Sequence, residues 1–355
     1  MRNLKLILPL LLVMAGCART TSNTSQQGAG ASEQKPAAEP TTPHAEPGAG
    51  PLRLTKTIPL PNVEGRIDHM DVDAKGQRLF IAALGNNTVE VVDLQTGTRI
   101  QSLRGFSEPQ GIRYLTASNT LVVANGGSGV IAFLDASFKQ IKTAHFGGDA
   151  DNVRYDSGHN KVYVGYGNGS LAVMDEGGER QGDIPVGGHP ESFQLDSTAG
   201  MAYVNVPARQ DVAVVDLNKK KVVSRWAVQG ASANYPMALD SERHRLFVVT
   251  RKPPHLLVYD TEAGKLVATL KGAADSDDVF YDGARRRVYA SFGEGTVLVY
   301  GQRDADNYDV TSTVATAPGA RTSFFSPELR QLYVAIPHRN TPTAEIRIYQ
   351  AAPWR

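Results

Sequence analysis

Polar and charged side chains recur at one position of this sequence about every 40 residues. The position lies five residues before a recurring strand-end residue (Asp73, Leu115, Asp156, Asp196, Asp240, Asp282, Ser326), and it is held by Asp68, Gln110, Asp151, Glu191, Tyr235, Asp277 and Arg321. We call this set the first rim column. A second rim column, two residues earlier, is Arg66, Glu108, Asp149, His189, Ala233, Asp275 and Gly319. Residues two apart lie on one side of a strand, so we expect both columns to converge.

The two columns and their neighbours supply the candidate ligand-binding residues Arg66, Asp68, Glu108, Gln110, Asp151, Asn152, Glu191, Asp277, Asp278 and Arg321. A hard cation such as calcium prefers carboxylate and amide oxygens, which makes the candidate metal ligands Asp68, Glu108, Asp151, Glu191 and Asp277. Charges of both signs can instead hold a polyhydroxylated or anionic ligand through charge-assisted hydrogen bonds. A divalent cation is therefore a candidate cofactor, and the sequence demands none.

Two histidines of the same region, His69 and His189, are the candidate catalytic residues. A histidine near carboxylates is expected to titrate close to neutral pH, which suits a general acid or base. His69 follows the first rim column and His189 belongs to the second, so a shared metal centre does not follow from the sequence. The structural alternative is that these polar residues form solvated turns or bond the backbone of a neighbouring unit.

Local motifs add little to this site. The stretch from Asp71 to Gly76 begins like a calcium loop, but Lys75 replaces a ligand, and we predict a hairpin turn. We also expect the run from Arg285 to Arg287 to be a solvated hairpin tip. The sequence has no Gly-x-Ser-x-Gly, His-Glu-x-x-His or phosphate-binding glycine motif, so serine hydrolase, zinc protease and nucleotide-binding functions lack support.

The elements that position these residues repeat seven times. An apolar or aromatic residue marks the middle of each second strand at steps of 42, 41, 40, 44, 42 and 44 residues: Phe80, Val122, Tyr163, Tyr203, Phe247, Tyr289 and Tyr333. The units alternate apolar and polar residues and contain no helical period. In the first unit we expect strands at 67–72, 78–82, 88–92 and 99–103. Four short strands at this period predict an all-β, seven-bladed propeller of four-stranded antiparallel blades.

The two ends of the repeat region complement each other. The last unit stops after its third strand, near residue 350, while residues 52–60 form a spare strand before the first unit. We therefore expect the N-terminal strand to complete the seventh blade and close the ring over residues 51–355. Closure hides the sheet edges that would otherwise invite aggregation.

The N-terminus and the composition limit location and partners. A charged start and an apolar run over residues 6–15 predict a secretory signal, too short to span a bilayer. It ends at Cys17, the only cysteine, and residues 18–50 lack large apolar side chains, so we expect a disordered tether. With 37 basic and 36 acidic residues, the chain has no strong positive field that would attract nucleic acid. We also expect a monomer.

Two resemblances extend these expectations. Repeats such as Tyr203-Val-Asn205 with Val212 to Asp216 resemble the YVTN-type β-propeller family over residues 52–350. Residues 13–17 resemble a bacterial lipobox, which implies lipidation of Cys17 and, with Ala18 after it, the periplasmic side of the outer membrane. The WD40, quinoprotein and haem-carrying propeller patterns fit less well.

Three functions remain open from the sequence. The first is an envelope lipoprotein that binds a small ligand or a protein partner at its polar rim, with the lipid anchor as its contact with the membrane. The second is a metal-assisted hydrolase or lyase acting on a sugar acid or lactone at that rim, and the third is a protein scaffold that uses its blade edges. The family resemblance indicates the fold and leaves the function undecided.

Overall fold

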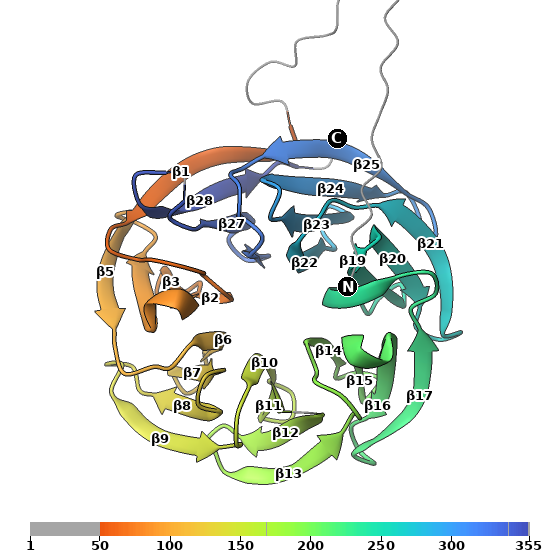
Figure 1. Cartoon of the computed structure of the whole chain (residues 1–355), viewed down its shortest axis with the longest axis horizontal. Coiled ribbons are helices and arrows are strands. Elements are labelled where there is room, and N and C mark those ends of the chain that lie inside the picture. The colour runs from red at the N-terminus through yellow and green to blue at the C-terminus, as the bar shows by residue number, and fades with distance from the viewer. Residues whose placement is uncertain (1–49, 168, 340, 354–355) are drawn as a thin grey trace, which may run out of the picture. The chain divides into compact units, whose positions relative to one another are not determined.

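The computed structural model describes residues 50–167, 169–339 and 341–353. Their strands form seven four-stranded antiparallel sheets, arranged as blades around a central channel (Figure 1). The first strand of each blade lies nearest the channel and the fourth lies at the outside. The predicted all-β, seven-bladed propeller is confirmed. The described residues contain no α-helix and no helix that is long and apolar enough to cross a bilayer.

The blades follow one another along the chain. Blades 1 and 2 contain β2 (Met70–Asp73), β3 (Arg78–Ala83), β4 (Thr88–Asp93), β5 (Thr98–Leu103), β6 (Pro109–Leu115), β7 (Thr120–Asn125), β8 (Val130–Leu134) and β9 (Gln140–His145). Blades 3 and 4 contain β10 (Ala150–Asp156), β11 (Lys161–Tyr166), β12 (Ser170–Asp175), β13 (Arg180–Pro185), β14 (Ser192–Asp196), β15 (Met201–Val206), β16 (Asp211–Asp216) and β17 (Lys221–Ala227).

The remaining blades complete the ring. Blades 5 and 6 contain β18 (Ser232–Asp240), β19 (Arg245–Lys252), β20 (Pro254–Asp260), β21 (Lys265–Lys271), β22 (Ser276–Asp282), β23 (Arg287–Phe292), β24 (Thr296–Gln302) and β25 (Tyr308–Ala315). Blade 7 contains β26 (Ser323–Ser326), β27 (Gln331–Ile336), β28 (Ala344–Ala351) and β1 (Leu52–Leu60). Two 3-10 turns, η1 (Leu84–Asn86) and η2 (Pro207–Arg209), follow β3 and β15.

Apolar side chains pack between neighbouring blades. All seven marker residues lie in second strands and are buried, and seven apolar clusters each join two successive blades. Phe80 and Val91 of blade 1, for example, share a cluster with Tyr114 and Leu121 of blade 2. Burying one such side chain contributes about 1.5–3 kcal/mol, so the stability of the ring comes from these seven interfaces.

The N-terminal strand closes the ring as predicted. β1 pairs with β28 in antiparallel register, with Ile58 opposite Ile346 and Leu60 opposite Ala344. Ile58 and Leu60 are fully buried in the cluster between blades 7 and 1. Two segments almost 300 residues apart are therefore held together by one ladder and one apolar cluster.

The recurring strand-end residues have a structural role. The Asp73 carboxylate accepts a hydrogen bond from the Gly76 amide at 2.8 Å, and Arg78 lies 2.7 Å from its other oxygen. Asp156, Asp196, Asp240 and Asp282 cap the same turn in their own blades. This confirms that residues 71–76 form a hairpin turn, in which the Asp73 carboxylate is paired with Arg78.

The arginine run after β22 differs from the expectation of a solvated tip. Arg285 and Arg287 are buried, and both donate to the Ala352 carbonyl near the C-terminal end, at 3.1 and 2.8 Å. Arg285 also pairs with Asp282 at 3.1 Å. The sequence pattern suggested exposure because it could not show that the chain end passes over this hairpin.

The other expected segments lie before the described part of the chain. These are the signal peptide at 1–17 with Cys17 and the tether at 18–50, of which only Gly50 is described.

Candidate functional site

Backbone irregularities at the inner strands place the first rim column. β6, β10, β18 and β22 each carry one extra residue relative to their partner strands, between Pro109 and Ile112, Ala150 and Val153, Asn234 and Met237, and Ser276 and Asp278. A bulge of this kind redirects side chains and often lies beside binding sites. The bulges contain Gln110, Asp151, Tyr235 and Asp277. The sequence pattern did not predict these bulges.

In blades 1, 4 and 7 the rim residues precede the inner strand. β2 begins at Met70, so the strand predicted from residue 67 starts three residues later, and Asp68 and His69 lie in the loop before it. The second rim column is not regular strand either. Glu108, Asp149 and Asp275 have φ values of 49°, 44° and 61°, a left-handed conformation in which Asp is enriched. The rule that residues two apart share one side therefore does not hold across these positions.

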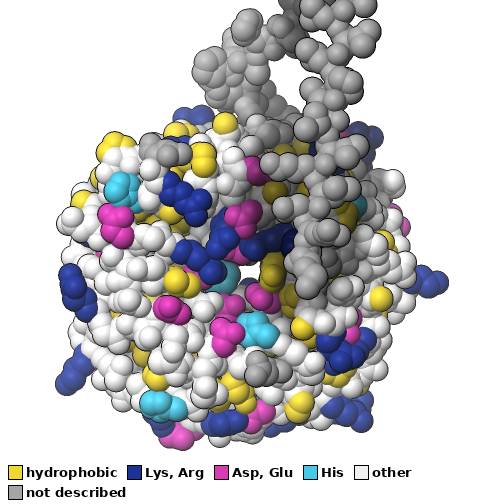
Figure 2. Space-filling model, in the orientation of Figure 1, with side chains coloured by type: hydrophobic (Ala, Val, Ile, Leu, Met, Phe, Trp, Pro, Cys, Tyr) yellow, Lys and Arg dark blue, Asp and Glu magenta, His cyan; other side chains and the backbone are white. Residues whose placement is uncertain are grey.

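Nine residues line a small hollow at one end of the central channel, which we call the channel mouth: Arg66, Asp68, His69, Asp151, Asn152, Glu191, Ser192, Tyr235 and Asp277. Six of the ten candidate ligand-binding residues are among them. On the molecular surface, acidic and histidine side chains gather on one side of the central opening and basic side chains on the other (Figure 2).

The other four candidates lie outside this lining. Arg321 and Asp278 contact residues of the mouth, as described below. Glu108 is exposed, and its amide donates to Asn87 Oδ1 at 2.7 Å. Gln110 lies against Gly126 of its own blade. The structure therefore does not bring Glu108 together with the other four candidate metal ligands.

One half of the mouth neutralises itself. This arginine half consists of three arginines and three carboxylates: Arg66, Arg251, Arg321, Asp68, Asp275 and Asp277. Arg66 lies 2.7 Å from Asp68, and Arg321 lies 2.7 Å from Asp277 and 2.9 Å from Asp275. Arg251 pairs with the second oxygen of Asp277 and stacks its guanidinium over the Tyr235 ring at 4.3 Å. Arg251 is not among the candidate residues of the sequence analysis.

The opposite half carries more acid than base. This acidic half consists of Asp149, Asp151, Glu191 and Asp278 with the two candidate histidines. The His69 ring lies between Asp278 Oδ1, 3.4 Å from Nδ1, and Asp151 Oδ1, 3.7 Å from Nε2. Four carboxylates therefore face two imidazoles, and the surplus charge is negative.

The surrounding carboxylates determine the charge of His69. Burial alone would lower its pKa, but Asp278, Asp68 and Asp151 outweigh that cost and raise the pKa to about 10. His69 is thus a fixed cation at neutral pH, above the near-neutral titration expected from the sequence. In this state it can donate a proton or a hydrogen bond but does not act as a base.

The carboxylates of the mouth are shifted in the same direction. Burial raises the pKa of Asp151 well above its ordinary value against the lowering effect of His69, and Asp68 and Glu191 add to the rise. Burial also raises the pKa values of Glu191 and Asp277. Each of these acids holds its negative charge at a cost that a bound cation would relieve.

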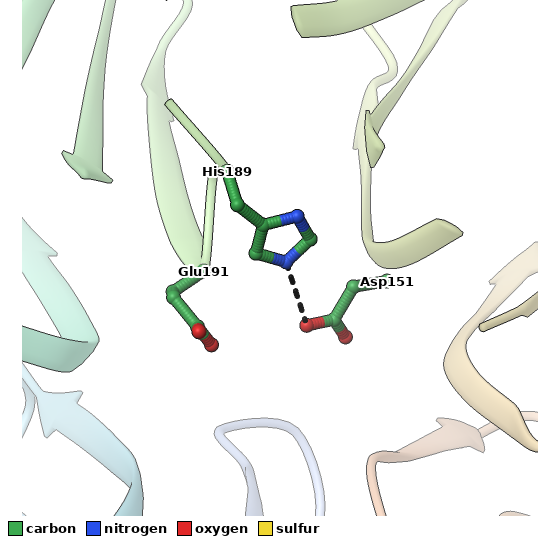
Figure 3. A group of neighbouring side chains, drawn as sticks. All are labelled: Asp151, His189 and Glu191. Atoms are coloured by element: carbon green, nitrogen blue, oxygen red, sulfur yellow. Dashed lines mark ion pairs between the residues drawn. The ribbon is translucent and has the colours of Figure 1, made fainter. Parts of the chain in front are cut away.

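A possible metal centre lies within the acidic half. Asp151, His189 and Glu191 each offer one ligand atom, and these atoms all lie within 4.8 Å of one another. His189 and Glu191 come from the segment before β14, Asp151 comes from the bulge of β10, and the His189 Nε2 atom faces Asp151 Oδ2 at 4.0 Å (Figure 3). The sequence analysis did not place His189 among the metal ligands, and the structure brings it together with Asp151 and Glu191.

Part of the rim is structural, as the alternative interpretation held. Asp278 accepts a hydrogen bond from the Ser323 amide of the next blade at 2.9 Å. The Asn152 amide donates to the Glu191 carbonyl, and Gln194 donates to the Met237 carbonyl at 2.7 Å, again from one blade to the next. These contacts fix neighbouring blades, and they leave Asp151 and Glu191 without a comparable backbone partner in the described residues.

Comparisons with known proteins agree with the fold. No family model matches the chain. Proteins named uncharacterized protein YncE from Salmonella typhi and from Salmonella typhimurium are 28% and 27% identical to it over 155 residues. The chain is a weak homologue of a propeller-type protein. The match covers 42% of this chain and 42% of each relative, so it spans less than half of their length.

A solved structure supports the same architecture. A chain of hydrazine synthase from Kuenenia stuttgartiensis superposes with a TM-score of 0.71, covering 82% of this chain and 98% of that one. The two are 16% identical, so this likeness shows the fold alone.

Proposed function

We propose that the protein is a binding propeller whose channel mouth holds a small positively charged ligand, organic or inorganic. The supporting observation is the surplus of buried negative charge in the acidic half. Arg66, Arg251 and Arg321 are already matched by carboxylates of their own half. Asp151 lies 3.7 Å from His69 and 4.0 Å from His189, both longer than a hydrogen bond. Arg66 and Arg251 act on Asp151 and Glu191 without a direct ion pair among the described residues.

This charge distribution distinguishes between the ligand classes left open by the sequence. An anionic or polyhydroxylated ligand would have to compete with Asp275 and Asp277 for the arginines. A cation meets two carboxyl groups whose raised pKa values report that their charges are poorly compensated. A β-propeller fold is compatible with such binding, and the charge of the mouth favours a cation.

The test is a thermal-shift series on the full-length chain. The probes are putrescine, lysine and agmatine with chelator, then calcium, magnesium, manganese and zinc without it, with citrate as the anionic comparator. A ligand present at about 100 times its Kd stabilises the folded protein by about 2.7 kcal/mol, which raises the melting temperature by roughly 5 °C. We expect at least one cation to give such a shift, and citrate to give none.

The matched variants are an Asp151→Asn, Glu191→Gln pair and Asp275→Asn. The paired change should abolish the shift without unfolding the protein, because neutral amides remove two costly buried charges at nearly constant shape. Asp275→Asn removes a carboxylate from the arginine half and should leave the shift in place. A chain that no cation stabilises, or one in which all variants respond alike, would refute the proposal.

A metal-assisted hydrolase or lyase is the second candidate function. It is favoured by the Asp151, His189 and Glu191 cluster, because three protein ligands leave coordination positions open for water or substrate. The test is hydrolysis of sugar lactones by metal-loaded protein, with the Asp151→Asn, Glu191→Gln pair as the blank. The scaffold alternative has less support, since the exposed large apolar residues are single ones on separate outer strands: Leu54, Ile100, Ile141, Val223 and Val310.

The location is a further proposal that the sequence alone supports. The lipobox-like residues 13–17 favour export, lipidation of Cys17 and anchoring in the outer membrane of the cell envelope, and the repeats favour membership of the YVTN-type family. Incorporation of labelled palmitate that is lost in Cys17→Ser would support the anchor. Unlabelled protein recovered in the soluble fraction would overturn it.

A further inference from the structure

His189 is held in the orientation of a metal ligand. Its Nδ1 atom lies 2.7 Å from the Gly167 carbonyl oxygen, which can only accept a hydrogen bond. Nδ1 therefore carries a proton, and in the neutral form of the ring the lone pair lies at Nε2. Asp149 Oδ2 lies 3.3 Å from the same Nδ1. Metal-binding histidines commonly show this arrangement, in which a carbonyl or carboxylate behind the ring fixes the tautomer and makes the ligand more basic.

The free side of the ring points into an incomplete set of ligands. Nε2 lies 4.0 Å from Asp151 Oδ2, too far for a hydrogen bond, and both atoms belong to the group that lies within 4.8 Å. Two ligands of one zinc ion, each about 2.1 Å from it, are at most about 4.2 Å apart. Small rotations of the side chains would bring all three residues onto one ion.

Three buried oxygens of the mouth have no hydrogen-bond partner among the described residues; Asp277 Oδ2 lies 2.7 Å from Arg321 in an ion pair, and the other two belong to Asp151 and Asn152. Asp151 is 7% exposed and Asn152 is 2% exposed, and the Oδ1 atom of each forms no hydrogen bond within the described residues. The Asn152 amide nitrogen donates to the Glu191 carbonyl, which leaves its oxygen as the free end of the group. Buried polar atoms are rarely left unsatisfied, so the Asp151 and Asn152 oxygens indicate a missing partner at this place.

We propose that Asp151, His189 and Glu191 bind a divalent first-row transition ion, with zinc as the best fit. This inference rests on the proposed function and deepens it by naming the cation. Calcium takes six to eight oxygen ligands, whereas a neutral imidazole with two carboxylates suits zinc and its neighbours. Asn152 Oδ1 supplies a further neutral oxygen beside the site. Asp149 acts as a positioning residue through His189.

The experiment is calorimetric titration of the chelator-treated, full-length chain with zinc, cobalt, calcium and magnesium chlorides. We expect one zinc per chain, and cobalt binding with a visible absorption band that reports nitrogen and oxygen ligands. Calcium and magnesium should bind at least tenfold more weakly. His189→Ala should weaken zinc binding by about 100-fold or more, since losing even an outer partner typically costs 10–100-fold.

Two variants separate coordination from general electrostatics. Asp149→Asn keeps the shape behind His189 but removes the charge, and it should weaken zinc binding about tenfold while shifting the cobalt band only slightly. Asp275→Asn removes one carboxylate from the arginine half of the same mouth and should leave zinc affinity within about twofold. Urea unfolding of each variant shows whether the fold is retained.

The outcomes separate this inference from the function on which it rests. Zinc binding that survives in His189→Ala, or calcium binding as tight as zinc, overturns the transition-metal site while leaving a cation-binding mouth. If amines bind in the presence of chelator and zinc does not bind, the transition-metal site is likewise overturned and the cation-binding mouth remains. A mouth that binds neither metals nor amines overturns both proposals.

Discussion

Raising the pH should weaken the fold through one side chain, His69. The pKa of His69 is about 10 in the folded protein, against an ordinary value of 6.5 for histidine, which we take for the unfolded chain. Below pH 6.5 the ring is protonated in both states, and its contribution to folding is complete. As the pH rises from 6.5 to 10, the unfolded chain releases this proton while the folded protein keeps it, so the stabilisation is progressively lost.

The expected magnitude follows from the same two values. The full rise in pKa corresponds to roughly 5 kcal/mol of stabilisation. Between pH 7.5 and 9.5, where the unfolded chain is already deprotonated at this position, the loss approaches about 1.4 kcal/mol per pH unit and totals roughly 2–3 kcal/mol. The raised pKa values of Asp151, Glu191 and Asp277 act in the same direction, with stability lost as each ionises above the ordinary carboxyl range.

The measurement is urea unfolding followed by circular dichroism at pH 7.5, 8.5 and 9.5, for the native chain and His69→Gln. Glutamine keeps a hydrogen-bonding side chain but does not titrate, so subtracting its curve removes the contribution of groups that His69 does not influence. The stability difference between the two proteins should shrink by roughly 2–3 kcal/mol over this range. A difference that stays constant with pH would refute the assignment of His69 as a cation held by Asp278, Asp68 and Asp151.

Two further predictions concern closure and the placement of the site. Ile58→Ala should lower the free energy of unfolding in urea by about 2–5 kcal/mol, because Ile58 is fully buried at the seam between the first and last blades. Leu54→Ala, on the exposed side of the same strand, should change it by less than about 0.5 kcal/mol. Equal costs would contradict closure by β1. Gly111→Ala would place a Cβ atom 1.8 Å from the Asp151 carbonyl oxygen, so it should displace the β10 bulge and weaken zinc binding by roughly tenfold or more. Gly283→Ala, whose Cβ would meet only the Tyr281 ring at 3.4 Å, is the control, and unchanged zinc affinity in Gly111→Ala would show that the bulge does not position the site.

The architecture could be predicted because each level of the sequence repeats the same information. Second-strand markers such as Phe80 and Tyr333 recur once per blade, and each is buried between two blades. The spare strand before the first unit had an obvious place, since the last unit lacked its fourth strand. Strand pairing within a blade is local, so short-range alternation and turn residues such as Asp73 were sufficient.

The site could be predicted only as a region. The first rim column converges because every blade places its inner strand at the same channel, and this brought Asp68, Asp151, Glu191 and Asp277 together. The contacts among them depend on bulges and on atoms from different blades. Gln110 belongs to the same column, but its side chain lies against Gly126 of its own blade. Residues at equivalent positions of the repeat therefore do not all reach the mouth.

The division of the mouth into two halves shows which charges need a further explanation. A carboxylate that is paired with an arginine, as Asp277 is with Arg321, or bonded to the next blade, as Asp278 is to Ser323, is accounted for by the stability of the ring. Asp151 has neither partner; its contacts with His69 and His189, at 3.7 and 4.0 Å, are longer than hydrogen bonds, although it is buried and its charge is costly. If the mouth served only to hold blades together, an amide at this position would do so at lower cost. We therefore regard the buried carboxyl group of Asp151, beside the oriented ring of His189, as the strongest reason to look for a bound cation here.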